Sequence, residues 1–404
     1  MKIGLIREGK IPQDKRVAFT PGQIKKIQQR YPEQIEFVVE PSPIRCYSNE
    51  EYIEAGILMH EDMAHCDILM GIKEVPISQL IPNKTYVFFS HTIKKQPSNR
   101  RMLQHILENN IQLLDYELFK NEKGERTVAF GRWAGIVGAY NGLWTYGQKS
   151  GLYDLKRAYT CFDRNEMDKE LEKVQLPPIK IVVTGKGRVG KGVEEVLKKV
   201  GIKEVSTQEF LHQYYEEPVF TVLGSSDYNR RKTDGGFDRE EFYKNPDKYE
   251  SHFLKYAEVS DILMAAAYWD HNAPKLFERE DIQSEEFNIS VIADITCDID
   301  GSIPTTVKAS TILDPVYDID RDSFSVLPAF GKQQSISVMA IDNLPTELPR
   351  NASEEFGDQL SEHFIPELLK PQSLILEKAT IARDGDLTLD FMYLKDYVNE
   401  RLKE

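Results

Sequence analysis

The sequence lacks a long apolar run, is poor in cysteine and has no excess of positive charge. No uninterrupted apolar stretch approaches the roughly 18 residues that a membrane-spanning helix requires, so no transmembrane segment is expected. The formal net charge is −14, and no basic stripe is present that would neutralise phosphates, so nucleic acid is not an expected partner. The chain opens at Met1 on a strand pattern, without a charged and then apolar leader, which predicts a cytoplasmic protein.

The cysteines argue against a metal site and against a disulfide framework. The four cysteines are Cys46, Cys66, Cys161 and Cys297. They are scattered along the chain, and no two form a C-x-x-C pair. Their spacing therefore suits a reducing compartment and predicts no bound metal.

The composition is that of a folded protein with more than one domain. A chain of 404 residues is long enough for about two or three domains of ordinary size. Hydrophobic residues make up 41% of the chain, which is enough to build full cores. Short apolar runs alternate with amphipathic stretches, and that alternation is typical of α/β folds.

The most informative stretch is a glycine-rich loop between a strand and a helix. Residues 179–184 form a short β-branched run that predicts a buried strand, and helical spacing of apolar residues begins at Val189. Between them lies the G-x-G-x-x-G pattern of a dinucleotide-binding loop, in the strand–turn–helix setting that this pattern requires. Glycine turns after strands also occur for structural reasons alone, but this setting favours a dinucleotide site. The expected cofactor-binding residues of the loop are Gly185, Gly187, Arg188, Val189 and Gly190.

Each glycine of this loop has a distinct expected role. Gly185 permits the tight turn, Gly187 lets the backbone approach a pyrophosphate, and Gly190 lets helix and strand pack closely. The diphosphate would rest on the N-terminus of the helix that follows.

The first part of the chain predicts a parallel sheet whose strand ends carry polar side chains. Strands are expected at residues 2–6, 35–39, 66–72, 84–90, 111–114 and 127–130, and helices at residues 21–30, 50–55, 97–109 and 133–147. Lys73 follows the third of these strands, and His91 follows the fourth. Because functional groups of open α/β sheets collect beyond the carboxyl ends of the strands, both residues are candidates for a site.

A second domain is expected around the glycine-rich loop. Its further strands are expected at residues 219–223, 261–267 and 289–295, with an insertion or lid at residues 226–258. The later pattern is helical, at residues 335–348, 353–369 and 391–402. Because an open parallel sheet needs helices on both faces, we expect these helices to return to the first domain. The expected domains are residues 1–136 with 325–404, and residues 137–324.

Several blocks of residues carry a resemblance to a known family. Arg7-Glu8 and the block Lys15–Pro21 are similar to the start of the alanine dehydrogenase and transhydrogenase superfamily. Further blocks narrow the resemblance, at residues 88–94, 128–135, 231–234, 294–302 and 341–345. Together they resemble lysine-forming saccharopine dehydrogenase, especially the lysine–2-oxoglutarate reductase half of the bifunctional enzyme of animals and plants. The sequence departs from the bifunctional form because it ends at Glu404, without the second half.

The resemblance implies a fold and a reaction. The fold would be α/β, with two Rossmann-like domains that have parallel sheets and an active-site cleft between them. The enzyme would use NAD or NADP, join the ε-amine of lysine to 2-oxoglutarate, and reduce the imine to saccharopine reversibly. Its partners would be these small molecules, and the chain could also form a homo-oligomer.

The resemblance also implies site residues. In that family the Lys of the Gly-x-Lys-Glu turn and the His of the Ser/Ala-His block are the proposed acid–base pair, which here are Lys73 and His91. The positively charged positions that surround the substrate carboxylates match Arg16, Lys94 and Arg126.

Positive neighbours would make Lys73 a usable base. The pKa of an ordinary lysine is about 10.4, and burial together with repulsion from Arg16 and Lys94 would lower it. The imidazole of a histidine such as His91 exchanges protons near neutral pH without a special environment. Each residue also has a plain structural reading, as a turn lysine, a strand-end histidine or a surface arginine. Asp298 matches a family position near the nicotinamide, but an aspartate there would equally cap a helix.

The sequence leaves the choice between NAD and NADP open. A NAD-specific fold normally places an acid about 20 residues past the first glycine, to hold the ribose 2′-hydroxyl. Here that acid is absent or displaced. Glu209 could still reach a ribose. Alternatively, a 2′-phosphate could be received by Ser206 and Thr207 with Arg188 or Arg231.

Two other classes of function remain open at this point. One is an alanine-dehydrogenase-like enzyme that acts on a small amino acid and shares the hydride donor. The other is a non-catalytic protein that binds NAD(P) and senses its redox state. The presence of Lys73, His91 and Arg16 argues against the second class.

Overall fold

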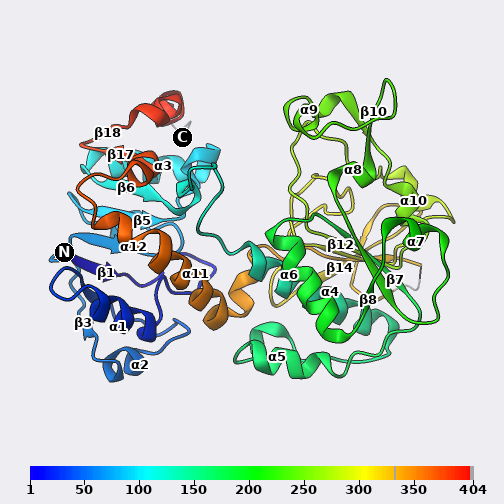
Figure 1. The fold of residues 1–404 in the computed structure, drawn as a ribbon, viewed down its shortest axis with the longest axis horizontal. Helices are drawn as coiled ribbons and strands as arrows, with labels where there is room; N and C mark the ends of the chain where they lie inside the picture. Colours follow the sequence, from blue (N-terminus) through cyan, green and yellow to red (C-terminus); the bar gives the residue numbers. More distant parts are fainter. Residues whose placement is uncertain (332–333, 401–404) are drawn as a thin grey trace. The chain divides into compact units, whose positions relative to one another are not determined.

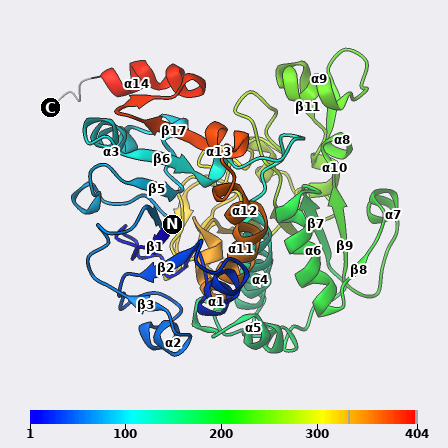
Figure 2. The same cartoon turned by 60° about the vertical axis from the view of Figure 1, so that its left-hand side comes forward.

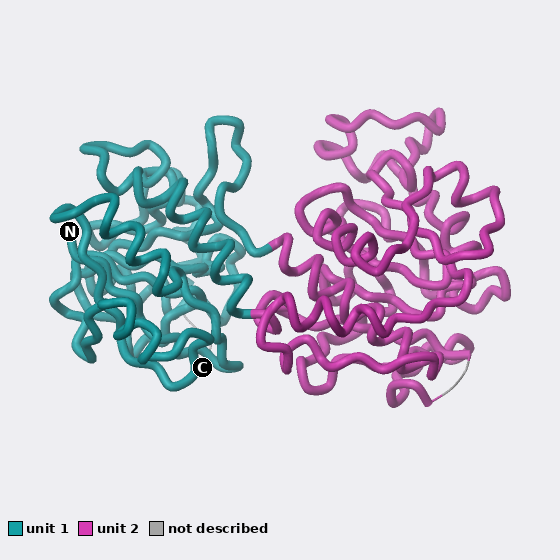
Figure 3. The backbone as a smooth tube through the Cα atoms, turned by 60° about the horizontal axis from the view of Figure 1, so that its bottom comes forward, with its two compact units in different colours: residues 1–130, 349–404 teal, residues 131–348 magenta. Residues whose placement is uncertain are grey.

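The structure is a computed structural model that describes residues 1–331 and 334–400. Two compact units make up the chain: Met1–Phe130 with Pro349–Glu404 (unit 1), and Gly131–Leu348 (unit 2) (Figure 3). The boundaries expected from the sequence, residues 1–136 with 325–404 and residues 137–324, differ from these units at both junctions. The largest difference is the segment 325–348, which lies in unit 2 because its strand pairs with the sheet of that unit.

Unit 1 is built on one eight-stranded sheet, in the order β18-β17-β6-β5-β4-β1-β2-β3. The parallel strands are β1 (Lys2–Leu5), β2 (Glu36–Val39), β3 (Leu58–Met59), β4 (Ile68–Met70), β5 (Thr85–Phe88) and β6 (Gln112–Asp115). Two antiparallel strands from the C-terminal segment, β17 (Thr380–Arg383) and β18 (Asp386–Leu387), complete the edge. The predicted parallel α/β sheet is confirmed, with strands shorter than the apolar runs.

The strand expected at residues 127–130 is wrong. The backbone N–H of Ala129 donates to the side-chain oxygen of Gln359 at 2.8 Å rather than to a neighbouring strand. Phe130 stacks on Phe356, with ring centroids 4.3 Å apart. This segment is therefore held by side chains of a C-terminal helix, and its apolar residues serve that packing.

The helices of unit 1 come from both ends of the chain. They are α1 (Pro21–Arg30), α2 (Asn49–Glu54), α3 (Pro97–Glu108), α11 (Pro349–His363), α12 (Ile365–Leu368), α13 (Leu374–Ala379) and α14 (Lys395–Asn399). α11 lies beside α1 (Figure 1), where the side-chain amide of Gln23 donates to the carbonyl oxygen of Glu354 at 2.6 Å. α14 lies beside α3 (Figure 2), where the amide of Gln104 donates to the carbonyl oxygen of Val398 at 2.6 Å. The C-terminal segment thus covers the N-terminal sheet.

Two of the expected C-terminal helices have different bounds. The helix expected at residues 353–369 is two helices, and Pro366 lies in the first turn of the second, where proline is tolerated, and not in a helix interior. Where a helix was expected at residues 391–402, the structure has a 3₁₀ helix at Leu389–Leu394 and an α-helix at Lys395–Asn399, while residues 401–402 lie outside the described residues.

Unit 2 is built on a second eight-stranded sheet, in the order β15-β14-β16-β13-β12-β7-β9-β8. The parallel strands are β7 (Lys180–Thr184), β8 (Lys203–Glu204), β9 (Val219–Leu223), β12 (Ile262–Ala265), β13 (Val291–Asp294) and β16 (Ile336–Met339). β14 (Val316–Ile319) and β15 (Val326–Leu327) run antiparallel at one edge. The main helices are α4 (Gly131–Ser150), α5 (Arg164–Leu171), α6 (Arg188–Val200) and α7 (Thr207–His212).

The helix expected at residues 335–348 is wrong. Residues 336–339 form β16, and a short 3₁₀ turn follows at Leu344–Glu347. The hydroxyls of Ser335 and Ser337 donate to the buried carboxylate of Asp318 on β14, at 2.5 and 2.7 Å. A short buried strand has an almost continuous apolar pattern, which periodicity cannot distinguish from a helix.

The insertion expected at residues 226–258 contains short elements. They are α8 (Ser225–Tyr228), β10 (Asn229–Arg231), α9 (Arg239–Lys244), β11 (Tyr249–Ser251) and α10 (Leu254–Ala257), with β10 and β11 forming a separate two-stranded sheet.

Glycines let two helices of unit 2 approach closely. A Cβ atom at Gly135 of α4 would collide with the carbonyl oxygen of Val189, and one at Gly192 of α6 would collide with that of Arg132. Arg132 also donates to both carboxylate oxygens of Glu195 at 2.6 Å. The start of α6, and with it the glycine-rich loop, is therefore fixed against α4.

None of the described helices is both long and apolar enough to cross a membrane.

Candidate active site

The glycine-rich loop of unit 2 has the shape of a phosphate cradle. Gly185 directly follows β7 and has a φ of +98°, and a Cβ atom there would lie 2.8 Å from the carbonyl oxygen of Ala266. A Cβ atom at Gly190 would collide with the carbonyl oxygen of Gly185. At Gly187, by contrast, a Cβ atom would meet no protein atom within 4 Å. The first and third glycines are thus required by the fold, whereas the second leaves open space where a diphosphate would approach the start of α6.

The remaining expected cofactor residues lie close to this loop or on a later strand end. Arg188 is exposed at the first position of α6, and Val189 is half-buried behind it. Asp298 is exposed, four residues beyond the last residue of β13. The loop residues fit a bound dinucleotide. No helix lies between Asp298 and β14 (Val316–Ile319) in the described structure, so the reading of Asp298 as a helix cap is wrong, and its place near the nicotinamide stays a prediction.

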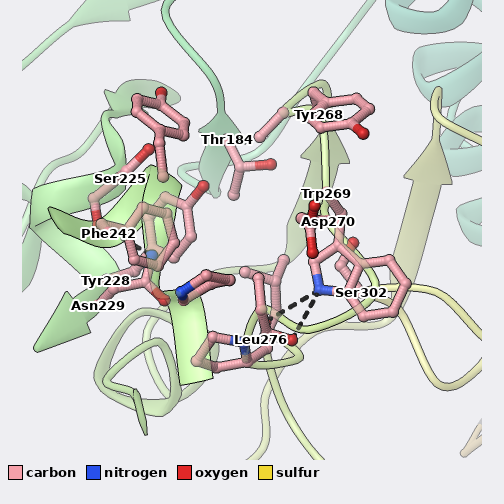
Figure 4. Close-up of a pocket in the computed structure, with 15 residues that line it drawn as sticks. Thr184, Ser225, Tyr228, Asn229, Phe242, Tyr268, Trp269, Asp270, Leu276 and Ser302 are labelled. Atoms are coloured by element: carbon pink, nitrogen blue, oxygen red, sulfur yellow. Dashed lines mark hydrogen bonds between the residues drawn. The ribbon is translucent and has the colours of Figure 1, made fainter. Parts of the chain in front are cut away.

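A cavity of about 140 Å³ opens at the carboxyl ends of β7, β9 and β12 (Figure 4). Much of its wall is aromatic, from Tyr228, Phe242, Tyr243, Tyr268 and Trp269. The indole N–H of Trp269 donates to the carbonyl oxygens of Ala273 and Pro274, which fixes the ring in the wall. Ligands of open α/β sheets bind at this end of the strands, and an apolar aromatic wall suits a planar ring. Sequence reasoning missed this wall, because its residues are scattered through the insertion and the loop after β12.

In unit 1, the structure brings Lys73 and His91 to one end of two neighbouring strands. β4 and β5 pair in parallel, so the segments that follow them emerge side by side. Nδ1 of His91 lies 2.7 Å from Oε1 of Glu74, the residue after Lys73. The other oxygen of Glu74 accepts from Nζ of Lys10 at 2.6 Å. The carboxylate of Glu74 therefore bonds both His91 and Lys10, and it belongs to the residue directly after Lys73.

The ionisation of this cluster follows from its contacts. Burial disfavours the Glu74 carboxylate, but hydrogen bonds from His91 and Lys10 outweigh burial and lower the pKa of Glu74 to about 2. Burial, followed by repulsion from Arg16, lowers the pKa of Lys73 below its ordinary value. The expected direction for Lys73 is thus present, but the second contributing cation is Lys10 rather than the expected Lys94.

A second carboxylate fixes the backbone at Lys73. Oε1 of Glu8 accepts from the backbone N–H of Ile72 at 2.6 Å, and Oε2 accepts from that of Lys73 at 2.9 Å. Burial, followed by repulsion from Asp14, raises the pKa of Glu8 to about 8, although these two N–H donors oppose the rise. Glu8 is therefore a carboxyl group that exchanges its proton in the working range of most enzymes.

The three cations expected to bind substrate all have carboxylate neighbours. Arg16 is buried and donates to both oxygens of Asp14, at 3.0 and 2.6 Å. Its guanidinium also lies 4.1 Å from the ring centroid of Phe130.

Lys94 and Arg126 converge on one carboxylate oxygen of Glu117, just past the end of β6. The distances from that oxygen are 3.4 Å to Nζ of Lys94 and 3.7 Å to Nη1 of Arg126. The ends of β4, β5 and β6 thus each bring charged groups to the same edge of the sheet. Sequence reasoning missed Glu8, Glu74 and Glu117, although the first two stand in the blocks that contain Arg7 and Lys73.

Among residues 1–331 and 334–400, no group of three or more His, Cys, Asp or Glu side chains is placed to hold a metal ion.

The chain is similar to proteins of known activity along nearly its whole length. Residues 4–137 match the family model "Alanine dehydrogenase/PNT, N-terminal domain". The chain is 30% identical to the mitochondrial alpha-aminoadipic semialdehyde synthase of Mus musculus over an alignment of 448 residues. The alignment covers 97% of this chain and 47% of that protein. The chain therefore spans about half the length of this relative. It is 26% identical to saccharopine dehydrogenase [NAD(+), L-lysine-forming] of Yarrowia lipolytica, covering 92% of each chain.

Solved structures support the fold. An L-alanine dehydrogenase matches 98% of this chain with a TM-score of 0.67 at 13% identity. A transhydrogenase from Sinorhizobium meliloti matches 95% of this chain with a TM-score of 0.58 at 13% identity. The resemblance inferred from the sequence blocks is confirmed by these relatives, and so is the α/β fold with two largely parallel sheets.

Proposed function

We propose that this protein is an NAD(P)-dependent oxidoreductase that acts on a CH–NH bond, as a lysine-forming saccharopine dehydrogenase. In one direction it joins the ε-amine of lysine to 2-oxoglutarate and reduces the imine to saccharopine, and in the other it reverses these steps. The observation that carries the proposal is the cluster of Lys73, Glu74 and His91 beyond β4 and β5. The Yarrowia lipolytica relative, whose name states this reaction, is matched over 92% of both chains.

Glu74 decides which atom of His91 exchanges a proton. With its pKa at about 2, Glu74 is ionised at neutral pH and only accepts hydrogen bonds. Nδ1 of His91 must then carry a proton and donate a hydrogen bond to Oε1 of Glu74. Nε2 is left as the atom that takes up or releases a proton, as the carbinolamine loses or gains water.

Lys73 supplies the second proton-exchanging group. Burial and Arg16 lower the pKa of Lys73, which increases the fraction of neutral amine available to accept a proton from the secondary amine of saccharopine. Glu8 accepts hydrogen bonds from the backbone N–H groups of Ile72 and Lys73. These bonds fix the backbone from which the side chain of Lys73 extends. Arg16, Lys94 and Arg126 are the proposed partners of the substrate carboxylates.

NAD or NADP, when bound, supplies or accepts the hydride. We place its diphosphate at Gly185–Gly190 and the N-terminus of α6, because Gly187 leaves open space there. Its adenosine half fits the aromatic cavity beyond β7, β9 and β12.

The test is NAD(P)H oxidation by the purified chain with 2-oxoglutarate and a panel of amines, including lysine and ornithine. The proposal expects turnover with lysine and formation of saccharopine. Turnover with pyruvate and ammonia alone would identify an alanine-dehydrogenase-like enzyme. Tight NAD(P)H binding without turnover on any pair would identify a non-catalytic sensor.

A further inference from the structure

The strand order of unit 2 changes which strand lies beside β7. In a dinucleotide-binding fold, the end of that neighbouring strand is where NAD is usually distinguished from NADP. In the usual order, the strand that follows the glycine-loop helix lies next to the first strand and carries the ribose-binding acid at its end. Here the strand after α6 is β8, and it pairs with β9 at the edge of the sheet. The neighbour of β7 is β9 instead, in register from Lys180 with Val219 to Thr184 with Leu223.

This order separates the residues after β8 from the glycine-rich loop. Ser206 and Glu209 follow β8, and β9 lies between them and β7. Both also have a structural role, since Ser206 caps α7 and its backbone N–H donates to Glu209 at 3.0 Å. Glu209, the acid that could have reached a ribose from the sequence alone, therefore follows a strand that does not neighbour β7.

A carboxylate follows β9, the strand that lies beside β7 where the strand after α6 would usually lie. Asp227 stands four residues after Leu223, but its side chain folds back, and Oδ2 accepts from the backbone N–H of Gly224 at 2.7 Å. The same oxygen lies 3.3 Å from Nζ of Lys186, the residue between Gly185 and Gly187. The carboxylate thus joins the end of β9 to the glycine-rich loop.

Asp227 lies beside residues that line the aromatic cavity. The flanking residues of α8, Ser225 and Tyr228, line the aromatic cavity together with Thr184 at the end of β7. The side chain of Asp227 is 24% exposed, so part of it is open to a ligand.

We propose that Asp227 binds the adenosine ribose hydroxyls and makes the protein select NADH over NADPH. The proposal rests on the proposed function only in that the chain binds a dinucleotide. A carboxylate accepts hydrogen bonds from ribose hydroxyls, whereas a 2′-phosphate would bring two further negative charges against it. The nearby cation, Lys186, is already paired with Asp227. Arg231, another candidate for a 2′-phosphate, donates to Glu241 at 2.7 Å and to Asp234 at 2.8 Å.

The experiment is a fluorescence titration of the full chain with NADH and with NADPH, without substrates. Wild type is expected to bind NADH more tightly. Asp227→Asn keeps an oxygen for the N–H of Gly224 but removes the charge and releases Lys186. We expect it to weaken NADH binding by about 10-fold, the effect of losing a hydrogen bond to a charged group, and to tighten NADPH binding. Glu209→Gln is the matched control and should leave both affinities unchanged.

A second variant covers the case in which Asp227→Asn folds poorly. Lys186→Met leaves the carboxylate without its cation, so the preference for NADH should increase, opposite in direction to Asp227→Asn. Preference for NADPH in wild type, or an unchanged ratio of affinities in both variants, would overturn the assignment. A chain that binds NADH through Asp227 but does not turn over saccharopine would instead refute the proposed function alone.

Discussion

Nδ1 of His91 and Oε1 of Glu74 lie 2.7 Å apart, so one buried carboxylate orients the imidazole beyond β5. Glu74 is also bonded to Lys10, which balances its charge. A histidine oriented in this way has one ring nitrogen committed and the other available for chemistry. The proton-exchanging groups of the proposed reaction therefore depend on carboxylates as much as on cations.

Glu74→Gln should destabilise the protein at neutral pH. The pKa of Glu74 is lowered from 4.5 to about 2 in the folded state, so the ionised form contributes stability that is fully present above pH 4.5. That contribution is lost as the pH falls through about 2. Thermal unfolding at pH 7 should show a loss of roughly 1–3 kcal/mol for the variant, as expected for a hydrogen bond to a charged group. Equal stability of wild type and variant at pH 7 would show that the pair with His91 contributes nothing.

For Glu8, the dependence of stability on pH should have the opposite sign, and Glu8→Gln should remove it. The pKa of Glu8 is raised from 4.5 to about 8 in the folded state, so folding favours its protonated form. Wild type then loses stability relative to the variant as the pH rises from about 4.5 through about 8. Across this range the melting temperature of wild type should fall relative to that of the variant as the pH rises, whatever the variant loses by having one acceptor oxygen instead of two. Parallel curves for the two proteins would contradict the burial of this carboxyl beside Asp14.

Gly187→Val should abolish cofactor binding and leave the fold intact. A Cβ atom at Gly187 meets no protein atom within 4 Å, so the added side chain fills only the space assigned to the diphosphate. The affinity for NAD(P)H, measured by titration, should fall beyond detection while the melting temperature stays near that of wild type. Gly22→Val is the control, because that position is equally open and lies in unit 1. An unchanged titration for Gly187→Val would remove the loop from the site.

Gly357→Val should destabilise unit 1. Gly357 is buried on α11, and a Cβ atom there would collide with the side chain of Gln23, which joins α1 to α11. Overpacking of this kind costs roughly 1–3 kcal/mol, measurable by denaturant unfolding. Gly22→Val, at an open position of α1, should cost much less. Similar losses for both variants would indicate a general effect of removing helix glycines.

Elements with a strong local signal could be predicted from the sequence. β9 has the predicted bounds, residues 219–223, and α1 has Thr20 as its cap, as threonine followed by proline indicates. Both signals lie within a few neighbouring residues. β16 was not predictable in this way, because Ile336–Met339 becomes a strand through pairing with β13 and β14, which are distant in the sequence.

The candidate site could be predicted only in part, for a similar reason. Lys73 and His91 follow consecutive strands, so their proximity to one sheet edge was expected. The carboxylates that contact this edge come from separate segments, and spacing does not show which of them fold back onto it. The order of β7, β8 and β9 is likewise a tertiary property, so sequence spacing points to Glu209 and not to Asp227 as a ribose-binding acid.

The most direct test of the proposed reaction is the rate of saccharopine oxidation against pH for wild type and Lys73→Met. The exposed Lys123→Met serves as the control. The pKa of Lys73 is lowered from 10.5, so wild type should show an ionisation on the basic side that begins below that pH. Lys73→Met should lack this ionisation and be slower by roughly 10²–10⁴-fold, the usual contribution of a general acid–base group, with NAD(P)H binding unchanged. Near-normal turnover with an unaltered pH profile in Lys73→Met would show that this lysine is only a turn residue and would contradict the account.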